Sequence, residues 1–151
     1  MALDSLIGPE LIFPEIQGAD RPTVLRDFAE RVAALGLVRD ADALYQKLWE
    51  REQLGSTGIG SGVAIPHCKM KGVERAILAV GLVRKGVDFG AVDAEPVRVL
   101  FLLVSPNDSP AEHLQALAAI SRWVKADRHV DQVLKAADRQ AIYELFQREG
   151  S

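Results

Sequence analysis

The sequence predicts a single α/β domain over residues 1–151, with a small mixed β-sheet flanked by helices. Two apolar runs, Ala76–Arg84 and Val97–Ser105, have the length of strands and are rich in Val, Ile and Leu. Segments with helical periodicity precede and follow them, and no repeat or linker divides the chain. A chain of 151 residues, 48% of them hydrophobic, is long enough to bury one core of its own.

The N-terminal third predicts one short strand and a pair of helices. Leu11–Ile16 is expected at a sheet edge, because Pro14 cannot donate to a β-ladder. A first helix is expected over Asp20–Gly36 and a second over Asp40–Gly55, packed as an antiparallel pair. The apolar residues at helical spacing are Leu25, Phe28, Val32 and Leu35 on the first helix and Leu44, Leu48 and Trp49 on the second.

The middle of the chain predicts strands and turns. Gly55–Gly62 holds four glycines in eight residues, which is too many for a helix interior. Val63–Ile65 has the character of a short strand that Pro66 ends. Val97–Ser105 is almost continuously apolar, which is typical of a central strand buried on both faces. A turn is expected in the connection over residues 88–96.

The C-terminal part predicts three helices. The first is expected to begin at Ser109, with Ser109 as its cap, Pro110 in its first turn and Glu112 reaching back as in a capping box. It continues through Leu114, Leu117, Ile120 and Val124. Two shorter helices are expected over residues 130–136 and 139–147.

Composition excludes several classes of protein. The net charge is −3, and Lys and Arg are scattered rather than clustered, so no nucleic-acid-binding face is predicted. The single cysteine, Cys68, excludes an internal disulfide and fits a reducing compartment. The N-terminus lacks the pattern of a signal peptide, and no apolar run is long enough to span a bilayer. We therefore expect a cytoplasmic protein without membrane insertion.

His67 is the first candidate for chemistry. A glycine-rich approach leaves backbone N–H groups able to face an anion, and the short strand and Pro66 then deliver His67 to the end of the sheet. A neutral imidazole can act as a nucleophile at cytoplasmic pH. The alternative is a structural histidine that closes a strand. Cys68 beside it is expected to be packed and inert.

His113 is the second candidate, since it falls near the N-terminus of a predicted helix. That end of a helix carries partial positive charge and unpaired N–H groups, which favour a bound anion. The alternative is a histidine on the helix surface. His129, the third histidine, stands among charged residues and is expected to be solvated.

Metal and nucleotide chemistry have little support in the sequence. It contains no His-Glu-x-x-His pattern, and its lone cysteine directly follows His67 rather than standing at chelating spacing. No nucleotide-binding loop, dinucleotide fingerprint or serine nucleophile elbow is present. We expect no metal and no cofactor.

The string Ser56-Thr-Gly-Ile-Gly-Ser-Gly-Val-Ala-Ile-Pro-His67 closely resembles the active-site signature of the fructose/mannitol-type IIA proteins of the bacterial phosphotransferase system. That family includes the nitrogen-related IIA proteins. The resemblance covers almost the whole chain and is sharpest over residues 51–69 and 97–118. It implies that His67 is the phosphorylated nucleophile and that His113 is the second histidine that stabilises it or the phosphate. It also implies that Arg51, otherwise a surface charge on a helix, contacts the phosphate.

Family members commonly have glycine after the active histidine, where this chain has Cys68. The resemblance implies a phosphocarrier that accepts a phosphoryl group from an HPr-like or NPr-like protein. A chain of this length with no fused domain favours the nitrogen type, which regulates target proteins such as kinases or ion transporters according to its phosphorylation state. A sugar-transport IIA that passes phosphate to a IIB domain is the alternative. An interaction module without transfer and a metal-assisted hydrolase are further alternatives.

Overall fold

The computed structural model describes residues 3–126 and 128–150, and its sheet is built around β6 (Val97–Pro106). Strand β6 pairs antiparallel with β5 (Ile77–Val87) on one side and parallel with β3 (Val63–Ala64) and β4 (His67–Met70) on the other. Strand β1 (Ile12–Phe13) pairs parallel with β5 at one edge, and β2 (Gly58–Gly60) lies beyond β3. The predicted mixed sheet with a buried central strand is confirmed.

The glycine-rich segment forms a hairpin between β2 and β3. Ser61 and Gly62 at its turn have φ values of 59° and 79°. Positive φ at both central residues is typical of a type I′ turn, whose twist matches that of the two flanking strands. Gly60 and Gly62, both at positive φ, therefore serve a tight antiparallel turn, where the sequence predicted only an irregular segment.

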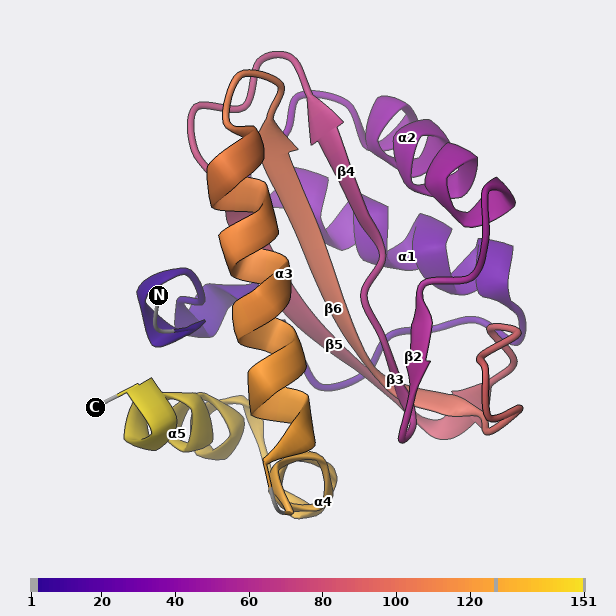
Figure 1. Ribbon diagram of the computed structural model, residues 1–151, viewed down its shortest axis with the longest axis vertical. Helices are drawn as coiled ribbons and strands as arrows, with labels where there is room; N and C mark the ends of the chain where they lie inside the picture. The colour runs from indigo at the N-terminus through magenta and orange to yellow at the C-terminus, as the bar shows by residue number, and fades with distance from the viewer. Residues whose placement is uncertain (1–2, 127, 151) are drawn as a thin grey trace.

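Two layers of helices cover the sheet (Figure 1). The helices α1 (Arg21–Ala34) and α2 (Ala41–Gln53) pack against each other behind it, and α3 (Pro110–Lys125) crosses its front. The short helix α4 (His129–Lys135) leads into α5 (Arg139–Gly150), which packs beside the 3₁₀ turn Leu3–Ser5. A second 3₁₀ turn spans Pro9–Leu11. Among residues 3–126 and 128–150, no helix is both long and apolar enough to cross a bilayer.

The helix starts differ from the prediction in one respect. Ser109 does occupy the N-cap position and Pro110 the first turn, but the Ser109 side chain makes no cap hydrogen bond. Its backbone, at φ −126° and ψ 56°, is part of a turn in which its N–H donates to the Pro106 carbonyl. The predicted capping box with Glu112 is therefore wrong. A capping box is present instead between Asp20 and Thr23 at the start of α1.

Two side chains are placed differently from the prediction. His129 is buried, with Nδ1 2.8 Å from the Trp123 carbonyl and its ring 4.8 Å from the Trp123 ring, so the prediction that it is solvated is wrong. Leu35, expected on the buried face of α1, follows the last helical residue and is 40% exposed. Both residues lie at a helix terminus, Leu35 just past the end of α1 and His129 at the start of α4, where helical spacing does not give the direction of a side chain.

Candidate functional site

His67 begins β4, the strand that continues the line of β3. Val63 pairs with Val99 and His67 pairs with Leu103, so the register with β6 is the same on both sides of Pro66. The Pro66 carbonyl still accepts from Leu103 N–H, although proline itself has no N–H to donate. The strand was expected to end at Pro66 with His67 at the end of the sheet. That prediction is wrong: His67 lies within the sheet, on a strand with no outer strand partner among the described residues.

The His67 ring is fixed by a single backbone contact. Its Nδ1 lies 2.7 Å from the carbonyl oxygen of Ile65. A carbonyl oxygen only accepts hydrogen bonds, so Nδ1 carries the proton and Nε2 is left with its lone pair. Partial burial lowers the pKa of His67 below its usual 6.5, the Ile65 hydrogen bond opposes this, and the Arg51 charge lowers it further. The ring is therefore neutral near pH 7, with Nε2 the nitrogen free to react.

His113, the fourth residue of α3, lies beside His67. The two ring centroids are 5.5 Å apart, and His113 is buried with Nδ1 2.7 Å from the hydroxyl of Ser105 on β6. Burial, with smaller contributions from the protonated form of His67 and from the charge of Lys69, lowers the pKa of His113 to about 4. His113 is therefore neutral and held by Ser105, rather than lying on the helix surface.

Arg51 reaches the same surface from the last turn of α2. Its Nη1 donates to the carbonyl of Gly55 at 2.8 Å, a contact that holds the guanidinium over the C-terminal end of the helix. Arg51 and both histidines line one hollow between α2, β4 and α3. All three predicted site residues are thus brought together, from segments far apart in the sequence.

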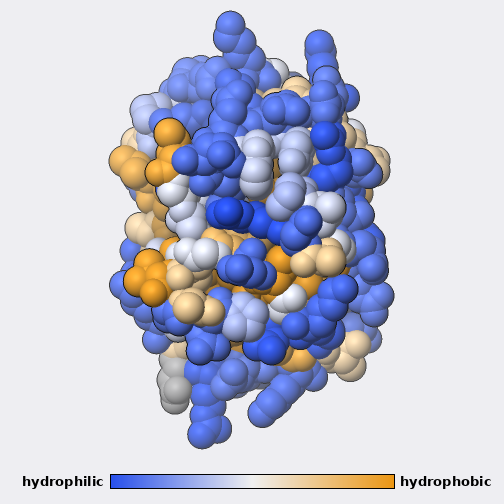
Figure 2. Space-filling view, turned by 90° about the vertical axis from the view of Figure 1, so that its right-hand side faces the viewer, coloured by the Kyte–Doolittle hydropathy of each residue, from blue (hydrophilic) through white to orange (hydrophobic). Residues whose placement is uncertain are grey.

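We call this whole hollow the acceptor surface. Around Arg51 and the two histidines, most of its lining is apolar or basic. Leu54 is 84% exposed and Leu114 is 66% exposed, both unusual for large apolar side chains. The residues that line the acceptor surface are Lys47, Glu50, Arg51, Gln53, Leu54, His67, Cys68, Lys69, His113, Leu114 and Leu117. Figure 2 looks onto the adjoining face, which is largely hydrophilic with separate groups of apolar side chains.

Of the two sequence neighbours of His67 for which a role was predicted, the glycine-rich stretch departs from its prediction and Cys68 agrees with it. The glycines of residues 55–62 do not line the acceptor surface, and two N–H groups of this stretch, those of Gly58 and Ser61, donate to the side chains of Ser56 and Asp93. The predicted anion-binding glycine stretch is therefore wrong. Cys68 is buried, and burial raises the pKa of its thiol to about 12. This confirms that it is packed.

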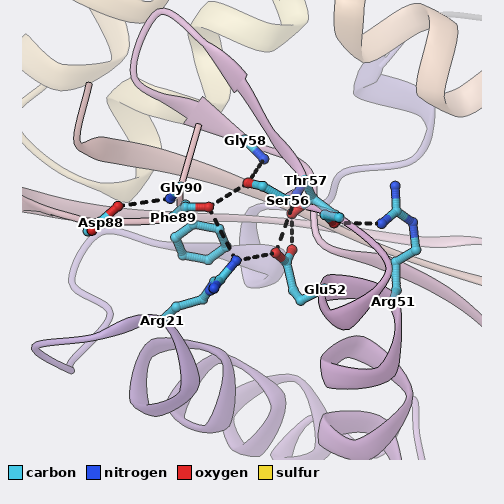
Figure 3. A network of polar contacts seen from close by, with 10 residues as sticks. Arg21, Arg51, Glu52, Ser56, Thr57, Gly58, Asp88, Phe89 and Gly90 are labelled. Atoms are coloured by element: carbon cyan, nitrogen blue, oxygen red, sulfur yellow. Dashed lines mark hydrogen bonds and ion pairs between the residues drawn. The ribbon is translucent and has the colours of Figure 1, made fainter. Parts of the chain in front are cut away.

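A buried polar network supports the segment that leads to His67 (Figure 3). The Glu52 carboxylate is fully buried and accepts from Arg21 Nη1 at 3.3 Å, from Thr57 N–H at 3.3 Å and from the Thr57 hydroxyl. Arg21 also donates to the Phe89 carbonyl, which accepts from the Ser56 hydroxyl as well. These contacts join α1, α2, the hairpin and the Phe89 loop.

The interpretation of the sequence missed Glu52 and Ser105, although both carry a signal. Glu52 follows Leu44 and Leu48 at intervals of four residues, so helical spacing alone puts a carboxylate on the buried face of α2. Ser105 lies near the end of the long apolar strand β6 and is fully buried. A polar side chain in such a position needs a hydrogen-bond partner, which for Ser105 is His113.

Metal ligation has no support among the described residues. Within residues 3–126 and 128–150, no three His, Cys, Asp or Glu side chains are grouped so that they could hold a metal ion. The two histidines at the acceptor surface have other partners for Nδ1, namely a backbone carbonyl and a serine hydroxyl.

Comparison with known proteins gives a consistent family. Residues 5–149 match the model of the phosphoenolpyruvate-dependent sugar phosphotransferase system, EIIA 2. A nitrogen regulatory protein of Bradyrhizobium diazoefficiens is 35% identical over 147 residues, which are 97% of this chain and 95% of that protein. A fructose-specific EIIA component of Haloferax volcanii is 32% identical over 143 residues, 94% of this chain and 93% of that protein.

The fold agrees with this family. The crystal structure of nitrogen regulatory protein IIA-Ntr from Neisseria meningitidis superposes with a TM-score of 0.87 at 24% identity, covering 95% of this chain and 98% of that one. The match of the family model over nearly all residues, together with the 35% identical relative, establishes the family. The chain belongs to the EIIA 2 family of the phosphoenolpyruvate-dependent sugar phosphotransferase system.

Proposed function

We propose that this protein is a phosphocarrier that accepts a phosphoryl group on Nε2 of His67 from a phosphorylated HPr-like protein. The observation that carries the proposal is the hydrogen bond from Nδ1 of His67 to the Ile65 carbonyl, which leaves Nε2 unprotonated on an open surface. In the transfer, the bond from Nε2 to phosphorus forms as the bond from phosphorus to the donor nitrogen breaks. The His67 Nδ1 proton stays where it is.

The neighbouring side chains suit the charge that arrives. Phosphoryl transfer depends mainly on positioning and on stabilising the oxygens of the transferred group. His113 is neutral, and when its Nδ1 accepts from Ser105, its Nε2–H is free to donate to a phosphate oxygen. The Arg51 guanidinium supplies a second donor from α2, with the planar geometry that phosphate oxygens favour.

The exposed leucines supply a surface for a donor protein. Leu54 directly follows α2 and Leu114 lies on α3, on either side of His67, so a partner that covers both closes over the imidazole. Apolar anchors surrounded by charged residues are typical of a transient protein interface. The donor and the protein would meet in the cytoplasm.

We further propose that the phosphorylated and unphosphorylated forms bind regulatory targets differently, and we expect these targets to be proteins such as kinases or ion transporters. A phosphoryl group adds a charge of about −1.5 to −2 near neutral pH, by analogy with phosphorylated hydroxyls. Placed in the middle of the acceptor surface, that charge changes which proteins the surface can bind. The 35% identical nitrogen regulatory protein supports this regulatory role.

The second candidate is a sugar-transport role, in which His67 passes the phosphoryl group to a IIB domain. The fructose-specific EIIA relative favours it, since its identity to this chain is almost as high. Both roles use the same acceptance step. They differ in whether a IIB domain removes the phosphoryl group rapidly.

The experiment is phosphoryl transfer from a phosphorylated HPr-type donor, followed by intact mass and by stability of the label in acid and base. We expect one acid-labile, base-stable phosphate on the wild type and none on His67→Ala. Equal labelling of His67→Ala would show that the acceptor is another residue. Addition of a IIB domain then separates the two roles, because rapid loss of the label to IIB supports sugar transport.

A further inference from the structure

We propose that Glu52 is a positioning residue for His67, acting through Thr57 and Ile65, and that it selects the tautomer of the imidazole. The inference deepens the proposed function, on which its kinetic consequence rests. Glu52 makes no contact with the ring itself; its effect passes along a chain of hydrogen bonds.

The series of hydrogen bonds begins at the buried carboxylate of Glu52. Its side chain has no exposed surface, and Thr57 donates to it from both its N–H and its hydroxyl. A buried carboxylate is stable only when its oxygens are paired, and Arg21 Nη1 provides the opposite charge at 3.3 Å. Thr57, itself buried, is therefore held at a fixed position and orientation.

The next links run through the backbone of the hairpin. The Thr57 carbonyl accepts from Ile65 N–H at 2.9 Å, and the Ile65 carbonyl accepts from His67 Nδ1–H at 2.7 Å. The backbone N–H and carbonyl of Ile65 thus connect Thr57 to the imidazole of His67. Hydrogen bonds in such a series polarise one another, and each fixes the position of the next acceptor.

The arrangement matters because the two tautomers of a free imidazole are close in energy. His67 is nucleophilic at Nε2 only when the proton is on Nδ1, and the Ile65 carbonyl is the group that holds it there. That carbonyl belongs to the short break between β3 and β4, where β-pairing with β6 does not fix it. Its orientation depends on Thr57, and through Thr57 on Glu52.

Arg21 completes the network on the side away from His67. Its guanidinium lies 5.7 Å from the Trp49 ring and 5.9 Å from the Phe89 ring, and it also donates to the Phe89 carbonyl. These contacts keep the counter-charge of Glu52 in place. Arg21 makes no hydrogen bond with Thr57 and acts on it through the Glu52 carboxylate, so its replacement should have a smaller effect than that of Glu52.

The test measures the His67 tautomer by ¹⁵N NMR of the ring nitrogens at neutral pH, together with the single-turnover rate of phosphoryl transfer. For Glu52→Ala we expect a population with the proton on Nε2 and a rate lower by on the order of 100-fold, the effect of a small misplacement of a reacting group. Glu52→Gln keeps an oxygen for Thr57 and should stay closer to wild type. The matched control is Asp42→Asn, which removes a surface ion pair from the same helix.

The outcomes separate this inference from the proposed function. A folded Glu52→Ala variant with the proton on Nδ1 and a wild-type rate would overturn the positioning role. Failure of the wild type to accept phosphate would overturn the proposed function, while the tautomer comparison would still decide the role of Glu52. If Glu52→Ala does not fold, Thr57→Val and Thr57→Ser decide instead: the serine should restore the Nδ1 proton that the valine loses, and equal tautomers in both would overturn the inference.

Discussion

At the scale of single residues, the chemistry depends on which nitrogen of each imidazole is occupied. His67 uses Nδ1 to bind the Ile65 carbonyl, and His113 uses Nδ1 to bind the Ser105 hydroxyl. Both rings therefore leave Nε2 available. Since burial lowers the pKa of both, neither ring is charged near neutral pH. The proposed pair is a neutral nucleophile beside a neutral hydrogen-bond donor.

The pH dependence of transfer follows from the lowered pKa of His67. Protonation of Nε2 removes the lone pair, so the rate should be flat above pH 7 and fall as the pH drops through the pKa of His67. Because that pKa lies below 6.5, the midpoint of the fall should also lie below 6.5. Single-turnover transfer to the protein across a pH series, with the donor saturating, measures this midpoint. A midpoint above 6.5 would contradict the assigned burial of the ring.

Replacement of His113 should weaken transfer without unfolding the protein. A hydrogen bond to a charged group contributes about 1.5–3 kcal/mol, so His113→Ala should slow transfer roughly 10- to 150-fold and shorten the lifetime of the phosphoprotein. The rate and the lifetime are measured with labelled phosphate, and circular dichroism checks the fold. An unchanged rate and lifetime would show that His113 does not contact the phosphate.

At the scale of elements, α1 packs closely against the sheet at Gly81. Gly81 on β5 has no side chain, and a Cβ there would lie 2.7 Å from Ile16 Cγ1 and 2.8 Å from Phe28 Cε2. Phe28 is fully buried at the middle of α1. A glycine is needed here because the backbone of β5 lies directly against these two side chains.

Gly81→Ala should therefore destabilise the protein by overpacking. Additional methyl groups in a well-packed core cost about 1–3 kcal/mol. Urea unfolding measures this cost, with Val92→Ala as the control, since Val92 is 94% exposed and its truncation should change stability by less than about 0.5 kcal/mol. Equal stability of Gly81→Ala and the wild type would mean that α1 can move away from the sheet without penalty.

The elements with strong periodicity were predictable from the sequence, and the short ones were not. Helices α1 and α2 and strands β5 and β6 have enough apolar residues at regular spacing to identify them. Strand β4 has the sequence His-Cys-Lys-Met after a proline, which has no strand pattern; its register with β6 makes it a strand. At Ser109, a backbone turn closed by the Ser109 N–H and the Pro106 carbonyl three residues earlier takes the place of the side-chain cap that the sequence pattern favoured.

The candidate site, too, was predictable from the sequence in part: its residues were, and their hydrogen bonds were not. His67, His113 and Arg51 could be proposed from a motif, and the structure brings them onto one surface. The hydrogen bonds to Ile65 and Ser105, which decide the tautomers, depend on side-chain geometry in the folded protein. Sequence could indicate which residue types are present at the site, but not which nitrogen each ring offers.

At the scale of the whole molecule, the acceptor surface is an exposed apolar region on an otherwise polar face. Leu54, at the end of α2, and Leu114, on α3, are its most exposed large apolar side chains, and the two helices lie on opposite faces of the sheet (Figure 1). The two layers hold them at a fixed separation around His67. A surface of this kind is suited to repeated, short-lived contact with partner proteins.

Charged replacements on this surface should weaken donor binding without affecting the chemical step. Burying one leucine contributes about 1.5–3 kcal/mol, so Leu54→Asp or Leu114→Asp should raise the concentration of donor needed for half-maximal transfer roughly 10- to 100-fold. The rate at saturating donor should stay near that of the wild type. Leu37→Asp is the matched control, because Leu37 is also exposed but borders a different hollow. Equal effects of all three would argue against a specific docking surface.

The stability of the whole protein should depend on pH through His113. Its pKa is about 4 when folded and near 6.5 when unfolded, so between these values the unfolded chain binds more protons. The stabilisation is complete above pH 6.5 and is lost as the pH falls through 4, at a cost of up to about 3 kcal/mol. Urea unfolding at pH 7 and pH 4 should show this loss in the wild type and a smaller loss in His113→Gln. Equal losses would contradict the burial of a neutral ring.

The position of the phosphate on the phosphorylated protein shows directly whether Nε2 of His67 is the acceptor. Phosphorus and nitrogen NMR of the wild type, after transfer from a phosphorylated HPr-type donor, distinguish the two phosphohistidine isomers and identify the residue. We predict a single phosphohistidine at His67 with phosphorus on Nε2 and the proton still on Nδ1. Phosphate on Nδ1 of His67, or on another histidine, would show that Nε2 of His67 is not the acceptor.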